Sequence, residues 1–272
     1  MEPWKAQLAF DRLVVTGGGS GIGRDTALAA ASTGAAVYVL GRRAEALEET
    51  AALAADAPGT VTALVADVTD PDSVDAAFAA IEADGGPAPA LVHAAAAVEY
   101  CPARDLTPAD FRKVVESVLF GAFDALHCWS KPLLESGSPG VAVFITSAIA
   151  AAGTPGASHS SAGKAGVEAM VKTIAREWGG DGIRLNVVGP GFVPVERTQA
   201  MWDDDAVSAP IREVIALGRP GTVAEIVGPI MFLLSEAATY VTGEVLVPDG
   251  GFRLTPHVVP RWKFDAEEGA GK

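Results

Sequence analysis

A glycine-rich segment near the N-terminus has the residues needed to bind a diphosphate. It reads Thr16-Gly-Gly-Gly-Ser-Gly-Ile-Gly23 and follows an apolar run. Glycines at positions 17, 21 and 23 let the chain turn sharply, and a helix starting near Gly21 would direct its N–H groups and positive dipole end at an anion. A glycine pattern alone is weak evidence, but here it joins a buried strand to a helix. The segment therefore predicts a dinucleotide pyrophosphate site formed by Gly17, Gly19, Ser20, Gly21, Ile22 and Gly23.

Two arginines follow the second expected strand, where the adenosine ribose of a dinucleotide would lie. An acidic residue there would accept from the 2′-hydroxyl of NAD, whereas Arg42 and Arg43 offer guanidiniums to a 2′-phosphate. The pair favours NADP(H) over NAD(H); two solvated arginines that open a helix are the alternative. Asp67, at the end of the third strand, could accept from the adenine amino group or could cap the next helix.

Short apolar runs alternate with longer Ala-rich stretches of helical spacing, which is typical of βαβ units around a buried parallel sheet. We predict strands near residues 11–16, 36–40, 61–66, 89–94, 140–147, 183–189 and 244–247. We predict helices near residues 21–33, 44–56, 71–84, 108–136, 156–179, 197–217 and 222–236, with Pro71, Pro108 and Thr222 at or beside helix starts. No repeat or composition shift indicates a second domain, so residues 1–272 are expected to form one α/β domain with a C-terminal tail over 252–272.

Composition excludes several classes of partner. The chain has 20 Lys and Arg against 34 Asp and Glu, a formal net charge of −14, which repels nucleic acids and anionic membranes. Cys101 and Cys128 are too few for a disulfide framework and are not spaced as a metal or redox pair, so we expect reduced thiols and no metal site. No apolar run approaches the roughly 20 residues of a membrane span. We expect a soluble, cytoplasmic protein that acts on a small molecule.

Several segments together resemble the short-chain dehydrogenase/reductase family over nearly the whole chain. They are TGGGSGIG at 16–23, Asp67-Val68, the region around Ser147, SAGKAGVEAM at 161–170, RLNVVGPG at 184–191 and VTGEVLVPDGG at 241–251. The resemblance implies a Rossmann-type, doubly wound parallel sheet of seven strands in the order 3-2-1-4-5-6-7, with helices on both faces. It also implies hydride transfer at a nicotinamide, a homotetramer or dimer built on the long helices, and a substrate lid over about 193–218. The further cofactor contacts that it implies are Val68, Ala94, Ala95, Lys164, Pro190, Gly191 and Val193.

The family's catalytic residues are only partly present. The resemblance implies a Ser, a Tyr and a Lys four residues after the Tyr; Ser147 and Lys164 match, but Ser160 stands at the Tyr position. A serine hydroxyl is a far weaker acid than a phenol, whose pKa is about 10, so Ser160 can orient an oxygen or a water but is not an effective proton donor. The family's asparagine on the preceding long helix falls on Val118.

Within the family, the chain is most similar in pattern to the NADPH-dependent 2,4-dienoyl-CoA reductases, which also carry a serine at the Tyr position. Enoyl reduction does not require a strong acid there, because a thioester carbonyl stabilises the dienolate and a water can protonate carbon. The tyrosine and asparagine that this branch uses to hold the thioester fall on Ile149 and Phe120. The run Asp203 to Asp205 in the expected lid also disfavours a polyanionic substrate tail.

Three residues near the expected pocket are candidates for substitute chemistry. Tyr100, in the loop after the fourth strand, is the one phenol that could reach the nicotinamide; a pocket-lining or surface aromatic is the alternative. His93 could be a base near neutral pH or could fill the place of a lost family asparagine. His159 precedes Ser160 and suits a capping or interface role.

These residues predict NADP(H)-dependent reduction of an activated C=C or C=O bond, in an enoyl thioester or a specialised metabolite. One alternative is a catalytically silent subunit that binds cofactor and forms a hetero-oligomer with an active paralogue. The other is a non-redox enzyme, such as a dehydratase, isomerase or cyclase, on the same fold.

Overall fold

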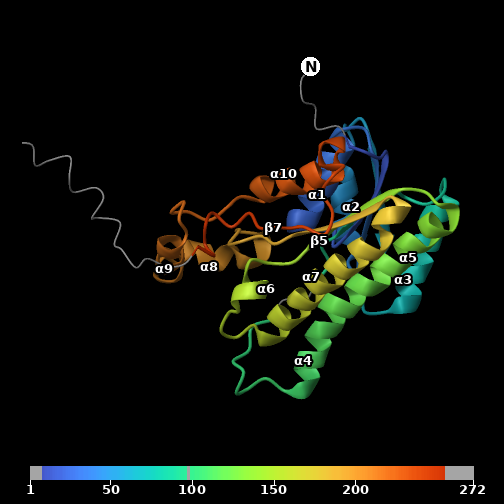
Figure 1. Cartoon of the computed structure of the whole chain (residues 1–272). Coiled ribbons are helices and arrows are strands. Elements are labelled where there is room, and N and C mark those ends of the chain that lie inside the picture. Colours follow the sequence, from blue (N-terminus) through green and yellow to red (C-terminus); the bar gives the residue numbers. More distant parts are fainter. Residues whose placement is uncertain (1–7, 97–98, 255–272) are drawn as a thin grey trace, which may run out of the picture.

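A parallel sheet of seven strands forms the centre of the structure, a computed structural model that describes residues 8–96 and 99–254 (Figure 1). The strand order is β3-β2-β1-β4-β5-β6-β7, and every neighbouring pair is parallel, which confirms the predicted topology. The strands are β1 (Arg12–Thr16), β2 (Ala36–Gly41), β3 (Thr60–Val65), β4 (Ala90–His93), β5 (Gly140–Ile145), β6 (Ile183–Val188) and β7 (Val245–Leu246).

Helices cover both faces of this sheet and enclose two hydrophobic clusters (Figure 1). Successive residues of a strand point to opposite faces, so Val14 belongs to one cluster while Leu13 and Val15 belong to the other. On one face lie α1 (Gly21–Ser32), α2 (Ala44–Leu53) and α10 (Val223–Leu234), and on the other lie α3 (Pro71–Ala83), α5 (Gly121–Ser136) and α7 (Ser158–Trp178). The single-turn 3-10 segments of the described residues are η2 (Gly179–Asp181), η3 (Glu196–Thr198) and η4 (Glu236–Ala238).

The predicted helix starts are confirmed at three places. Pro71 and Pro108 occupy the first turns of α3 and α4 (Pro108–Val115), where a missing N–H costs nothing. Thr222 caps α10 by accepting from the backbone N–H of Glu225, whose carboxylate accepts in return from the N–H of Thr222. These caps fix where each helix leaves the edge of the sheet.

The helix predicted over 108–136 is confirmed in its bounds, but its middle is a π-helical turn. The π-helix η1 (Glu116–Phe120) separates α4 from α5. One extra residue in this turn widens the helix where α7 approaches closely. A Cβ atom on Gly163 would lie 3.0 Å from Val118 Cγ1, so glycine at that position allows the close contact between η1 and α7.

The predicted single helix over 197–217 is wrong, because the structure divides this range into three elements. It consists of η3 (Glu196–Thr198), α8 (Gln199–Asp203) and α9 (Asp205–Val214). The break falls at Asp204, whose backbone is extended and whose carboxylate accepts from the N–H of Ala206 at 2.9 Å. A short helix that was not predicted, α6 (Ile149–Ala152), follows β5.

The chain after β7 turns back onto Phe192, just before the expected lid segment. The ring of Phe252 packs edge to face on Phe192, with 5.0 Å between ring centroids. The remaining residues of the predicted tail, 255–272, lie outside the described part of the chain. None of the helices within 8–96 and 99–254 combines the length and hydropathy that a membrane span needs.

Candidate functional site

The glycine-rich loop makes backbone contacts that only glycine allows. Gly17 has φ +71° and Gly21 has φ +52°, conformations that side-chain-bearing residues rarely adopt. A Cβ on Gly17 would lie 2.8 Å from backbone atoms of Ala94 and Ala95, and one on Gly23 would overlap the carbonyl oxygen of Gly17. The loop is therefore held against the end of β4 and against the first turn of α1, as a phosphate-binding turn requires.

The N-terminus of α1 has no side-chain cap among the described residues. Ser20 is the N-cap residue, but its hydroxyl makes no capping hydrogen bond. The first turn of α1, which the structure describes in full, contains no acidic residue. Ile22 packs against the hydrophobic core and so anchors the loop. Gly19 lies close against α2, since a Cβ on Gly19 would be 3.1 Å from Ala46. Uncapped N–H groups and the positive helix end fit the pyrophosphate of a dinucleotide.

The carboxyl ends of β2 and β3 bring Arg42 and Asp67 together. The Arg42 guanidinium is 74% exposed and lies 4.0 Å from Asp67 Oδ2. Arg43 is also exposed and is the N-cap residue of α2. Helix capping by Asp67 is wrong, because Asp70 caps α3 and Asp67 Oδ1 accepts from the N–H and the hydroxyl of Thr69. This rim offers exposed guanidiniums to a phosphate.

His93 is buried at the end of β4 and belongs to the framework of the loop. Its Nδ1 lies 3.0 Å from Thr16 Oγ1, which also accepts from the N–H of Ala95 at 3.3 Å. The ring packs 5.8 Å from Phe144, and Nε2 has no hydrogen-bond partner among the described residues. Burial lowers the pKa of His93 to about 4. The structure favours the framework alternative over a base near neutral pH.

The polar residues of the expected catalytic set lie at the start of α7 and after β5. Ser160 and Lys164 are 2% and 9% exposed and lie one helical turn apart on the buried face of α7. Ser147 precedes α6, which contacts α7. The Ser147 hydroxyl accepts from the N–H of Ile149 at 3.4 Å and donates to the carbonyl oxygen of Pro190 at 3.5 Å. Both bonds are long, so a substrate oxygen can replace them.

Two further candidates, Tyr100 and His159, lie in opposite surroundings, one exposed and one buried. Tyr100 is 69% exposed in a loop that crosses the turn before α7, where Cys101 N–H donates to the carbonyl oxygen of Gly156 at 2.8 Å. Its exposure fits the surface alternative. His159 is fully buried against Phe111 of α4, and neither ring nitrogen has a hydrogen-bond partner among the described residues. A capping role for His159 is wrong, because Ala157 is the N-cap residue of α7 and no side chain caps the helix.

The ends of β6 and β7 supply the rest of the expected cofactor surface. Pro190 accepts through its carbonyl from the N–H of Ala148 at 2.8 Å, which joins the chain after β6 to the chain after β5. A Cβ on Gly191 would lie 2.6 Å from the Cα of Asp249, so glycine is required there too. Val193, where the expected lid begins, packs against the cluster under α1 and α10. On the opposite side of the loop, Val68 touches α5, since a Cβ on Gly121 would lie 2.7 Å from its carbonyl oxygen.

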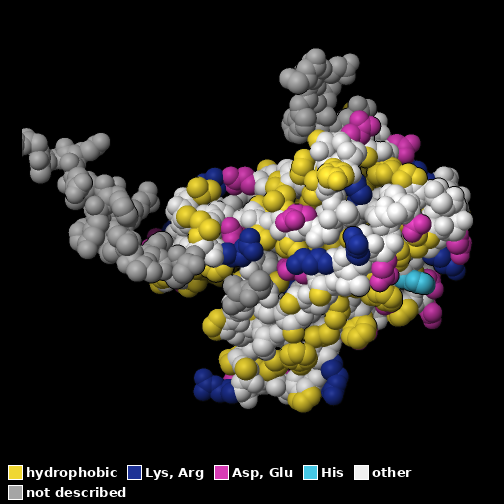
Figure 2. Space-filling model, viewed as in Figure 1, with side chains coloured by type: hydrophobic (Ala, Val, Ile, Leu, Met, Phe, Trp, Pro, Cys, Tyr) yellow, Lys and Arg dark blue, Asp and Glu magenta, His cyan; other side chains and the backbone are white. Residues whose placement is uncertain are grey.

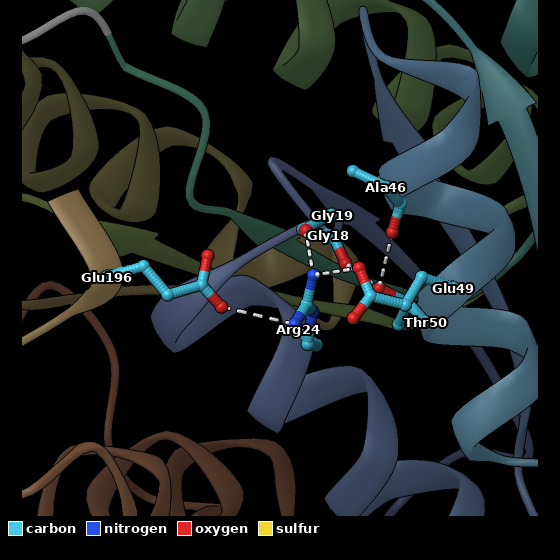
Figure 3. Close-up of polar contacts among 7 residues, drawn as sticks. All are labelled: Gly18, Gly19, Arg24, Ala46, Glu49, Thr50 and Glu196. Atoms are coloured by element: carbon cyan, nitrogen blue, oxygen red, sulfur yellow. Dashed lines mark hydrogen bonds and ion pairs between the residues drawn. The ribbon is translucent and has the colours of Figure 1, made fainter.

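Sequence reasoning missed Arg24, which links three parts of the site (Figure 3). Its guanidinium donates to the Gly19 carbonyl oxygen at 2.7 Å, to Glu49 of α2 at 3.1 Å and to Glu196 of η3 at 3.2 Å. The one sequence signal for this role of Arg24 was a basic residue directly after the glycine loop. Glu196 is far away in the sequence, so the pairing could not be predicted.

Comparison with known proteins identifies the family. A family model described as "Enoyl-(Acyl carrier protein) reductase" matches residues 17–253. The chain is 36% identical over 250 residues, 90% of this chain and 97% of the relative, to the "Probable 2,4-dienoyl-CoA reductase" of Bacillus subtilis (strain 168) that is described as (2E)-enoyl-CoA-producing. The chain belongs to the short-chain dehydrogenase/reductase family. A second relative, 34% identical over 89% of this chain and 92% of its own, is the 3-oxoacyl-(acyl-carrier-protein) reductase MabA of Mycobacterium tuberculosis (strain ATCC 25618 / H37Rv).

Solved structures of this short-chain dehydrogenase/reductase fold agree. A "putative 2-deoxy-d-gluconate 3-dehydrogenase" from Agrobacterium tumefaciens, crystallised with bound NADP, superposes with a TM-score of 0.82 at 32% identity, covering 89% of this chain and 95% of the other. A short chain dehydrogenase from Bacillus anthracis gives 0.82 at 34% identity, with coverages of 91% and 98%. The relatives are named as dehydrogenases and reductases, so the chain belongs to a family of oxidoreductases.

Proposed function

We propose that the protein is an NADP(H)-dependent reductase of a C=C bond conjugated to a carbonyl, as in an enoyl thioester. The observation that carries this proposal is Ser160, a buried hydroxyl one turn before Lys164 at the position where the family has tyrosine. Reduction of a ketone needs an acid that protonates oxygen as hydride arrives. Reduction of a conjugated C=C bond needs only donors that stabilise charge on the carbonyl oxygen, which serine hydroxyls can supply.

The dinucleotide part of the proposal is supported by the loop and by the arginines. The glycine loop and the uncapped α1 suit a pyrophosphate, and Arg42 and Arg43 suit a 2′-phosphate. The NADP bound to the relative from Agrobacterium tumefaciens supports the same choice. When bound, the dinucleotide supplies a hydride from its nicotinamide.

The chain's own residues would divide the remaining work. Lys164 would hold the nicotinamide ribose with its ammonium group. Ser147 and Ser160 would donate to the carbonyl oxygen of the substrate, and a water would protonate the α carbon. Val118, Phe120 and Ile149 provide no polar side chain, so the substrate carbonyl would depend on the two serines.

The lid narrows the class of substrate. Asp203, Asp204 and Asp205 place negative charge along α8 and the start of α9. Asp205 is paired with Arg212 at 3.3 Å, and Asp203 accepts from Gln199 at 2.9 Å. These carboxylates favour an enone or a thioester with few negative charges over a coenzyme A ester.

The assembly expected of this family has a matching surface. Phe111, Phe120 and Phe123 are 36%, 52% and 47% exposed along α4, η1 and α5. Figure 2 shows hydrophobic side chains gathered over the part of the molecule where Figure 1 places α4 and α5. Such an apolar face supports burial against another subunit, and we propose that a second copy of the chain covers it.

A silent subunit is the second candidate, because the positions of three family polar groups are apolar here, at Val118, Phe120 and Ile149. The two functions are separated by NADPH oxidation, followed by absorbance, with conjugated enones and enoyl thioesters of increasing length. The proposed reductase gives turnover with at least one of them and saturable NADPH binding. Tight NADPH binding without turnover on the whole panel would support the silent subunit instead.

A further inference from the structure

Arg24 is a nearly buried cation that joins the phosphate loop to the lid. Its side chain is 13% exposed, whereas the Glu49 and Glu196 side chains are 59% and 67% exposed. The guanidinium also donates to the Gly19 carbonyl oxygen at 2.7 Å, which anchors it to the loop. In Figure 3, Glu196 approaches Arg24 from one side, while Glu49 and the Gly18–Gly19 backbone lie on the other. The cation is thus fixed to the rigid part of the fold and presents one edge to the lid.

The start of the lid also touches the loop directly. A Cβ on Gly21 would lie 3.4 Å from Val195 Cγ1, so the Val195 side chain covers the residue at which α1 begins. Thr198 holds this first lid turn together, because its hydroxyl accepts from the N–H of Val195 at 3.1 Å. Residues 195–198 therefore behave as one small unit, and Glu196 is its link to Arg24.

We propose that Arg24 is a positioning residue that clamps residues 195–198 over the phosphate loop through Glu196, and that this clamp sets how long the dinucleotide stays bound. The inference rests on the proposed dinucleotide function. Val195 lies over Gly21, beside the uncapped N–H groups that suit the pyrophosphate, so the dinucleotide can leave freely only when this turn lifts. Lifting it breaks the Arg24–Glu196 pair and leaves the Arg24–Glu49 pair intact.

The arrangement provides a matched control. Glu49→Gln and Glu196→Gln each remove one carboxylate from the same guanidinium, and both glutamates are exposed. Only Glu196 lies in the lid. A general weakening of the loop would follow from either change, whereas a clamp on the lid depends on Glu196 alone.

The test measures two quantities in the wild-type protein and in the single variants Glu196→Gln, Glu49→Gln and Arg24→Gln. The double variant Arg24→Gln/Glu196→Gln is measured as well and is compared with Arg24→Gln. The first is backbone hydrogen exchange of residues 195–203 in the protein without dinucleotide. The second is the NADPH dissociation rate by stopped-flow fluorescence. For Glu196→Gln we expect exchange and dissociation to be roughly two- to fivefold faster, the range for a partly exposed ion pair. Glu49→Gln stays close to wild type, and Glu196→Gln has no further effect when Arg24 is already glutamine.

The outcomes are separable. Equal effects of Glu49→Gln and Glu196→Gln, or unchanged exchange in residues 195–203 of Glu196→Gln, would overturn the clamp. Faster exchange with an unchanged NADPH dissociation rate would overturn its role in retaining the dinucleotide. A wild-type protein that binds no NADPH would contradict the proposed function and the retention role, while the exchange measurement would still decide whether the clamp on the lid exists.

Discussion

The hydroxyl oxygen of Thr16 lies 3.0 Å from Nδ1 of His93, which ties the last residue of β1 to the last residue of β4 directly below the glycine loop. The next residue, Gly17, is in close backbone contact with Ala94 and Ala95. The polar pair and the glycine contact act on the same two strands. Together they hold the loop at the depth in the sheet that a diphosphate requires.

This pair makes folding stability depend on pH. Burial lowers the pKa of His93 to about 4 from 6.5, so between these values the unfolded chain binds a proton that the folded chain does not. The contribution of neutral, buried His93 to the free energy of unfolding is complete above pH 6.5. This contribution falls by roughly 3 kcal/mol as the pH drops from 6.5 to 4. Urea unfolding of wild type and His93→Asn from pH 4 to 8 measures it. Wild type should lose stability on acidification more steeply than the variant; parallel profiles would contradict the assignment.

The contact between Gly23 and Gly17 predicts a specific loss. In Gly23→Ala the new methyl group overlaps the Gly17 carbonyl oxygen, so the loop must move or the helix must shift. We expect loss of dinucleotide binding and destabilisation by roughly 2 kcal/mol or more. Calorimetric titration with NADPH and thermal unfolding measure the two effects.

Gly228→Ala is the control for this change. Gly228 lies in α10, and a Cβ there meets no atom within 4 Å. Because alanine favours helix, this variant should be as stable as wild type or more stable by about 0.5–1 kcal/mol, with unchanged binding. Equal damage by both substitutions would show that the close approach at Gly23 is not the cause.

Most of the fold could be predicted because its signals are local. Buried parallel strands are short apolar runs, and Pro71, Pro108 and Thr222 act through their own backbone positions. The π-helix at 116–120 could not be predicted, because one extra residue in a turn barely changes the apolar spacing. The break at Asp204 had a local signal, since aspartate is a preferred N-cap residue, but the run Asp203 to Asp205 was interpreted only as a charged face.

Arg42 is predicted to select the phosphorylated cofactor. Its guanidinium is exposed at the rim of β2, and within the described residues its ion pair is the 4.0 Å contact with Asp67, so it can turn to a 2′-phosphate. Arg42→Ala should weaken NADPH binding roughly tenfold, as expected for loss of a charge-assisted hydrogen bond, and leave NADH binding unchanged. Fluorescence titrations with both cofactors measure this. An equal loss for NADH and NADPH would mean that Arg42 acts on the fold and not on the phosphate.

Cys128 is predicted to be an unreactive thiol. Burial, together with the hydrogen bond to Asp75 at 3.0 Å, raises its pKa to about 12. Because the thiolate is the reactive form, alkylation at pH 8 should be slow in the folded protein. Asp75→Asn should speed it, and the urea-unfolded protein should label fully, as peptide mass mapping after iodoacetamide treatment would show. Rapid labelling of folded wild type would contradict the assigned environment.

The candidate site could be predicted only where the type of a single residue determines its chemical role. The glycines, Arg42 and the change from tyrosine to Ser160 stand in the sequence itself. Burial was not predictable, and it decides the character of His93 and His159. The Arg24–Glu196 pair joins helix α1 to the lid and exists only in the folded chain, so no local pattern could indicate it.

We propose that a buried serine in place of tyrosine directs reduction to C=C bonds. The most direct test is a comparison of kcat/KM for a 2,4-dienoyl thioester and for the 3-oxoacyl thioester of the same acyl chain, with deuterium-labelled NADPH. We expect the dienoyl substrate to be preferred by a factor on the order of 100, the usual contribution of a positioned acid, and deuterium to appear on carbon while the carbonyl is retained. Equal or faster reduction of the 3-oxo group, with deuterium on the new carbinol carbon, would contradict it.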